Sequence, residues 1–133
     1  MKKTSKLENR AKIVNYIYQF EVLDEKLSSD QAFTSGDFTE QDLKKIDAIS
    51  NKYESFKSLV NKFIVQGWSW SRLAPLERAI LLYGAFELSY IDRALVINEM
   101  VILAQGYIPD ESYKYINKIL ERIGNYFDKI KRN

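Results

Sequence analysis

The sequence of 133 residues contains no cysteine and no histidine, and the two absences narrow its possible chemistry. Without cysteine there is no disulfide framework, no thiolate zinc site and no thiol nucleophile. Without histidine the chain lacks the commonest general base and the commonest metal ligand. It also lacks a glycine-rich phosphate loop and a paired metal-ligand motif. We therefore predict no metal site and no cofactor.

Carboxylates are plentiful, but they are scattered among lysines in the manner of solvated helix faces. The nearest candidate pair for acid–base chemistry is Glu87 and Glu99, which would need burial and proximity that a sequence does not show. Enzymatic activity is therefore not expected, and the residues favour a helical binding module.

Long apolar runs and a strong excess of one charge are also absent. The net charge is +2, from 20 basic and 18 acidic residues, so the overall balance does not by itself indicate nucleic-acid binding. No apolar run approaches the roughly 20 residues that span a bilayer. The N-terminal residues MKKTSKLENRAK lack the apolar stretch of a signal peptide. We expect one cytoplasmic domain with no membrane partner.

Only two prolines and five glycines interrupt the chain, and the segments between them have the apolar spacing of helices. The sequence therefore predicts an all-α fold. Its centre is the segment from Trp68 to Tyr90, in which residues 79–86 carry no charge. A helix that is apolar on every side is a buried one, and Pro75 suits its first turn. Glu77 and Arg78 are the charged residues near its start, where a helix end meets solvent.

Other helices are predicted on both sides of this segment. Their expected ranges are about 5–27, 39–66, 94–106 and 111–129, with a turn-rich connector at 28–38. Thr39 and Asp110 are placed to cap the second and the last of them. The pair Ser50 and Asn51 leaves open whether residues 39–66 form one helix or two.

The N-terminal basic segment consists of Lys2, Lys3, Lys6 and Arg10, with Lys12 just beyond it. Cations at a helix N-terminus oppose the macrodipole by about 0.3–1 kcal/mol each. The placement is therefore mildly unfavourable for folding and slightly favours a ligand, while a solvated helix start explains it equally well.

Tyr115 lies between Lys114 and Lys118, mainly outside the apolar stripe of the last helix. A tyrosine flanked by lysines suits nucleic acid, because its ring can stack on a base while the ammonium groups approach phosphates. A peripheral tyrosine that packs against a neighbouring helix is the simpler interpretation of this residue alone.

Several ordered motifs resemble one known family. The string WSWSRLAPLERAIL, from Trp68 to Leu81, is similar to the signature of the NusB family of transcription antitermination factors. The similarity continues through FEL at 86–88, VINE at 96–99 and YINKIL at 115–120. Arg10-Ala11 and Ile17-Tyr18 sit where the family has an arginine-rich approach and a Leu-Tyr pair. The resemblance covers nearly the whole chain, and weakly only about 23–53.

The resemblance implies a NusB-like fold of six to seven helices, arranged as two packed three-helix bundles of about residues 1–67 and 68–133. It also implies a function in transcription regulation. The family pairs with NusE, a small-subunit ribosomal protein, and the pair binds boxA RNA of nascent rRNA transcripts. That complex joins RNA polymerase with other Nus factors and suppresses premature termination.

The resemblance also assigns residues by position. Tyr18 and Glu77 would face NusE. The RNA-binding residues would be Lys2, Lys3, Lys6, Arg10, Tyr107, Glu111, Lys114 and Tyr115. This chain departs from the family in its lysine-based N-terminal arm, since lysine lacks the planar fork of arginine. Lys118 and Leu82 also replace a usual glycine and a common arginine.

Two alternatives remain open. One is a helical protein-interaction adaptor without an RNA role. The other is a stand-alone relative of the NusB-like domain of an rRNA cytosine methyltransferase, although no methyl-donor site is seen in the sequence. The resemblance also leaves a homodimer open, because some members of the family pair with themselves.

Overall fold

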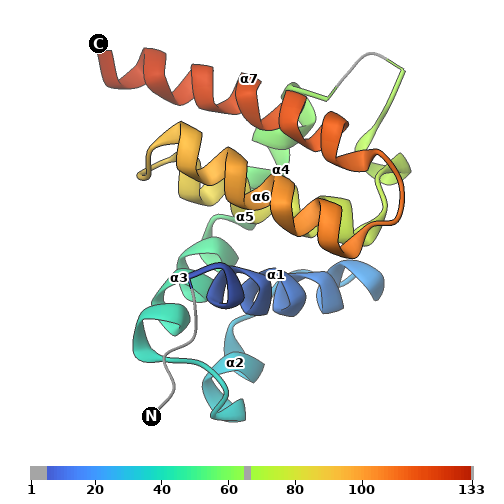
Figure 1. Cartoon of the computed structure of the whole chain (residues 1–133). Helices are drawn as coiled ribbons and strands as arrows, with labels where there is room; N and C mark the ends of the chain where they lie inside the picture. The colour runs from blue at the N-terminus through green and yellow to red at the C-terminus, as the bar shows by residue number, and fades with distance from the viewer. Residues whose placement is uncertain (1–5, 65–66, 133) are drawn as a thin grey trace.

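The computed structural model describes residues 6–64 and 67–132, and every regular element within these ranges is helical (Figure 1). The all-α prediction is therefore confirmed. The helices are α1 (Lys6–Val22), α2 (Asp30–Ser35), α3 (Glu40–Asn51), α4 (Tyr53–Lys62), the 3-10 turn η1 (Trp70–Arg72), α5 (Pro75–Leu88), α6 (Arg93–Tyr107) and α7 (Ser112–Arg132).

Helix α5 is the centre of the molecule, as its composition predicts. It contacts α1, α4, α6 and α7, and residues 79–85 are all buried. Burying a leucine or isoleucine side chain stabilises a fold by about 1.5–3 kcal/mol, so this helix contributes much of the core. Gly84 lets α7 approach closely, because a Cβ there would lie 2.8 Å from the Cδ2 of Leu120.

Helix α1 ends at Val22, five residues before the predicted end. Asp24 adopts a left-handed φ of 53°, and the amide of Glu25 donates to the carbonyl of Phe20 at 2.9 Å. This is the hydrogen bond of a helix C-cap that usually employs glycine. Because this position holds an aspartate and not a glycine, the sequence did not predict that the helix ends here.

The predicted connector at 28–38 contains a short helix, α2, so its assignment as irregular chain was wrong over residues 30–35. The hydroxyl of the buried Tyr16 accepts a hydrogen bond from the amide of Ala32 at 3.1 Å and donates to the carbonyl of Ser28. Gly36 ends the helix in the left-handed region. A contact with α1 therefore stabilises a segment too short to form a helix alone.

The predicted amphipathic stretch at 39–66 forms two helices, which resolves the open choice. The hydroxyl of Thr39 accepts from the amide of Asp42 at 3.1 Å and caps α3, as predicted. The chain leaves helical geometry at Lys52, one residue after the suspected break at Ser50 and Asn51. Both helices turn their buried faces toward the same core.

The buried side chains form one continuous core that includes residues from α1 through α7. The predicted division into bundles of about 1–67 and 68–133 stays a prediction, since α5 packs on helices from both sides of that boundary. Within 6–64 and 67–132, no helix combines the length and apolar character needed to cross a membrane.

Candidate functional site

The residues assigned to RNA lie in two groups on the molecule. Lys6 is exposed at the start of α1, while Lys2 and Lys3 lie outside the described residues. The second group surrounds the connection between α6 and α7, and Figure 1 draws this connection on the other side of the view from the start of α1. It consists of Tyr107, Glu111, Lys114 and Tyr115.

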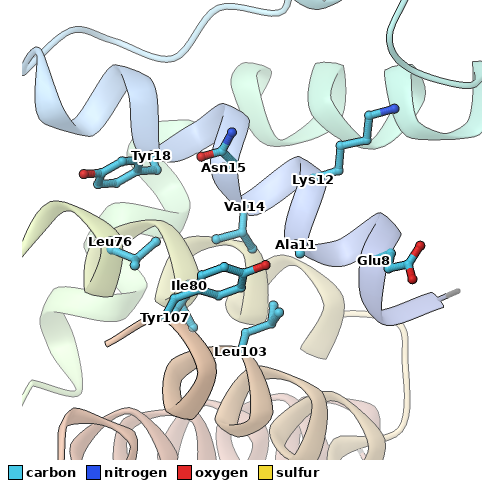
Figure 2. A pocket seen from close by; sticks show the side chains of 10 residues that line it. All are labelled: Glu8, Ala11, Lys12, Val14, Asn15, Tyr18, Leu76, Ile80, Leu103 and Tyr107. Carbon is cyan, nitrogen blue, oxygen red and sulfur yellow. The ribbon is translucent and has the colours of Figure 1, made fainter. Parts of the chain in front are cut away.

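An open groove of about 430 Å³ runs along α1 and brings some of these residues together (Figure 2). Its apolar floor comes from three helices. Tyr18 lines it from α1, and Tyr107, which is 63% exposed, reaches across from α6. The remaining lining residues are Glu8, Ala11, Lys12, Val14, Asn15, Leu76, Ile80 and Leu103. One residue assigned to NusE and one assigned to RNA therefore share a groove.

Glu77 follows the groove residue Leu76, and its carboxylate already has a structural task. Its Oε1 accepts a hydrogen bond from the amide of Ala74 at 2.8 Å, at the N-terminus of α5. Pro75 occupies the first turn, as predicted. The expected acid at the helix start is present, but it is half-buried and serves as a cap instead of projecting freely into solvent.

Arg10 is buried in the structure, only 7% exposed. Its Nε lies 2.7 Å from Oε1 of Glu87, and its Nη1 lies 3.7 Å from Oε1 of Glu99. Burial alone would lower the pKa of Arg10, but the hydrogen bond and the charge of Glu87 outweigh burial and raise it. Arg10 is therefore a buried cation that joins α1 to α5 and α6. It is not part of the exposed basic surface.

The possible acid–base pair of Glu87 and Glu99 is thus brought together, with a guanidinium between the two carboxylates. Glu87 also accepts from the hydroxyl of Tyr83 at 2.8 Å. Burial beside Glu87 raises the pKa of Tyr83 and raises that of Tyr90 to about 12. Both carboxylates are paired with the guanidinium of Arg10, so the three residues form a structural network. No cluster of metal-ligating side chains occurs among the described residues.

A second buried carboxylate, Glu21, repeats this arrangement at the opposite end of α1. Its Oε1 lies 3.0 Å from Nε of Arg78, and its Oε2 accepts from the hydroxyl of Tyr53 at 2.6 Å. Arg78 also donates to the carbonyl of Leu73 at 3.2 Å. The network fixes the start of α5, and with it Leu76, against α1. The network joins residues that are distant in the sequence, and no local pattern indicates it.

Tyr115 packs against the indole of Trp68, with ring centroids 5.4 Å apart. Its ring is half-buried, and this partner lies in the segment before η1, whereas the simpler interpretation expected a neighbouring helix. Lys114 is exposed and lies 3.0 Å from Oε1 of Glu111. Hydrogen bonds from Ser112 lower the pKa of Asp110, which caps the start of α7 as predicted.

Known proteins are similar to this chain in sequence and in fold. A model described as the NusB family matches residues 7–125. The transcription antitermination protein NusB of Methylacidiphilum infernorum (isolate V4) is 32% identical over 129 residues, 90% of each chain. Its namesake in Staphylococcus haemolyticus is 31% identical over 126 residues, 90% of this chain and 98% of the relative. The solved structure of T. maritima NusB, 24% identical, shares the fold with a TM-score of 0.79 over 93% of each chain. The chain therefore belongs to the NusB family of transcription antitermination factors.

Proposed function

We propose that this protein is a cytoplasmic antitermination factor that pairs with NusE and binds boxA RNA of nascent rRNA transcripts. In this role it joins RNA polymerase and other Nus factors. The relatives from Methylacidiphilum infernorum and Staphylococcus haemolyticus are both named as transcription antitermination proteins, and each aligns over nine-tenths of this chain. That similarity supports the class of function, and the surface supports its details.

The observation that carries the proposal is the groove shared by Tyr18 and Tyr107. The NusE face comprises Tyr18, Leu76 and the adjoining Glu77, while Tyr107 begins the RNA group at the end of α6. A protein partner seated on the groove therefore meets the RNA surface along one edge. This continuity explains physically how NusE would strengthen RNA binding, since the bound RNA would contact both proteins.

Two exposed cationic regions support RNA binding. Lys6 lies at the start of α1, and Lys114 lies in the first turn of α7. The bridge between Lys114 and Glu111 is exposed on both sides, and such bridges contribute only about 0–1 kcal/mol. A phosphate can replace the carboxylate of Glu111 at little cost. Arg10 is left out of the proposed surface because Glu87 already holds it.

The groove also allows a test of the assigned partner face. Tyr18→Ala should weaken NusE binding, because it removes a ring from the groove. Gln19→Ala is the matched control, since Gln19 is exposed on the same helix and does not line this groove. Calorimetric titration of NusE into each variant measures the difference. Equal affinities for the two variants would contradict the assigned partner face.

Self-pairing through the groove would compete with NusE. Light scattering of the free protein and of its mixture with NusE separates a homodimer from a heterodimer. We expect NusE to produce a one-to-one complex, and a homodimer that excludes NusE would count against the proposal.

A further inference from the structure

Trp68 is a large aromatic residue that remains exposed in the folded chain. The side chain is 51% exposed and belongs to the segment between α4 and η1. Its ring lies against Tyr115 of α7, with centroids 5.4 Å apart and planes inclined by 41°. Tyr115 is half-buried, so the pair forms an aromatic surface that is anchored on one side and open to solvent on the other.

The backbone beside Trp68 is held in place. Nη1 of Arg72 donates to the carbonyl of Gly67 at 2.9 Å, and Gly67 has a φ of 93°, which favours glycine. The amide of Arg72 also donates to the carbonyl of Ser69 at 3.0 Å. The indole is therefore presented from an ordered turn, which reduces the entropy lost when a ligand stacks on it.

Exposed cations flank the two aromatic residues along the chain. Arg72, Lys114 and Lys118 are exposed, while Glu111 is the acid paired with Lys114. Aromatic rings interleaved with cations are the combination that binds single-stranded nucleic acid, because bases stack on rings while phosphates meet the cations. Lys114 and Tyr115 also belong to the RNA group assigned by resemblance.

The other tryptophan, Trp70, differs in its burial and in its neighbours. Trp70 is half-buried, and its ring is covered by Lys57 at 5.5 Å and by Arg78 at 5.8 Å from the ring centroid. The protein's own cations therefore occupy the positions that a ligand would take. Only Trp68, of the two tryptophans, offers an open ring.

We propose that Trp68, supported by Tyr115, is a stacking platform for an unpaired base of the bound RNA. The inference rests on the proposed RNA binding and adds a contact outside the residues assigned by resemblance. Because stacking tolerates any base, Trp68 contributes affinity more than sequence preference. Its effect should therefore be similar for boxA RNA and for a scrambled RNA.

The presence of only two tryptophans permits a direct test. In the Trp70→Phe variant, Trp68 is the sole indole, and its fluorescence should be quenched as boxA RNA is added in the presence of NusE. The quenching midpoint should coincide with the midpoint of the anisotropy change of fluorescently labelled RNA. In the complementary Trp68→Phe variant, RNA should leave the emission of Trp70 nearly unchanged.

Affinity measurements complete the test. Trp68→Ala should weaken RNA binding roughly tenfold, within the range known for loss of one stacked base, and Trp68→Phe should retain most of the affinity. Phe33→Ala is the matched control, because Phe33 is 55% exposed and lies on α2, far from α7 (Figure 1). Circular dichroism of each variant verifies that the helices are intact.

Three outcomes would overturn the inference. RNA binding by anisotropy, with no quenching and an unchanged affinity of Trp68→Ala, would reject the platform while leaving the proposed function intact. Quenching by NusE alone, with no further change on adding RNA, would make Trp68 a protein contact. Absence of any RNA binding would reject both the platform and the proposed function.

Discussion

Nε of Arg10 lies 2.7 Å from Oε1 of Glu87, and this buried ion pair joins the start of α1 to the end of α5. A second ion pair, with its cation on α5 and its carboxylate on α1, joins the opposite ends of the two helices. In this pair Nε of Arg78 lies 3.0 Å from Oε1 of Glu21. The two pairs fix α1 antiparallel to α5, with the groove of Tyr18 along one side. The networks therefore determine the spacing of the proposed partner surface.

Breaking the first of these pairs should be costly. Arg10→Met leaves the carboxylate of Glu87 buried without its cation, and such a loss typically costs about 3–5 kcal/mol. Urea unfolding measures the effect. Arg93→Met is the control, because its ion pair with Asp128 is partly exposed and should contribute only about 0–1 kcal/mol.

A double variant examines the coupling directly. Arg10→Met combined with Glu87→Gln should be less destabilised than the sum of the two single changes, because the second change removes the buried charge that the first leaves unpaired. Strict additivity would show that the two side chains act independently, against the geometry.

Alkaline pH should destabilise the protein through its buried tyrosines. Burial and the charge of Glu87 raise the pKa of Tyr83, while a tyrosine in the unfolded chain has a pKa of about 10. The stability that Tyr83 contributes is fully present below that value and is lost as the pH rises above it, by up to about 1.4 kcal/mol per pH unit. Tyr83→Phe should flatten this decline between about pH 10 and 11.5.

The control for this pH experiment is Tyr107→Phe, because Tyr107 is exposed at the groove. Thermal unfolding across the alkaline range should give the wild-type slope for Tyr107→Phe and a shallower slope for Tyr83→Phe. At neutral pH, Tyr83→Phe should itself be less stable by about 1–3 kcal/mol, since Glu87 loses a donor. Identical slopes in all three proteins would contradict the assignment.

Two helical glycines should respond differently to alanine. A Cβ at Gly84 would lie 2.8 Å from Cδ2 of Leu120 and 3.3 Å from Cγ of Met100, both fully buried. Overpacking costs about 1–3 kcal/mol, against a gain of about 1 kcal/mol in helix propensity. We expect a net loss of stability for Gly84→Ala.

Gly124 provides the comparison, because the three atoms nearest to a Cβ there all belong to the side chain of Arg93, which is partly exposed and can move aside. Gly124→Ala should therefore be close to neutral. Denaturant unfolding of the two variants measures the difference, and equal stabilities would show that α5, α6 and α7 are packed less closely than the distances indicate.

Glu77 needs two substitutions, because its carboxylate caps α5 as well as facing the proposed partner surface. Glu77→Gln keeps an acceptor for the amide of Ala74 and removes the charge, so NusE binding should weaken with little loss of stability. Glu77→Lys should weaken NusE binding further and lose about 0.5–2 kcal/mol as a lost helix cap. Calorimetry with NusE and urea unfolding separate the two effects. Unchanged binding by both variants would remove Glu77 from the interface.

Much of the fold is predictable because its patterns are local. The uncharged run at 79–86 predicted the buried centre, and Thr39 predicted a helix start. The features that were missed depend on distant contacts: α2 needs the hydroxyl of Tyr16. Arg10 looked like part of a basic surface because its partner, Glu87, lies 77 residues away in the sequence.

The candidate site was predictable mainly through resemblance, since Tyr18 and Tyr107 are ordinary aromatic residues in the sequence. Their common groove is formed only when α1, α5 and α6 pack together. The contact between Trp68 and Tyr115 likewise joins residues that are more than forty positions apart in the sequence.

The most direct test of the account is a titration of fluorescently labelled boxA RNA with the purified protein, with and without NusE. We predict that boxA RNA binds more tightly than a scrambled RNA, that NusE strengthens the preference, and that affinity falls linearly with the logarithm of salt concentration as counterions are released. Equal binding of the two RNAs at moderate salt with NusE present, or no binding of either, would contradict the proposed antitermination function.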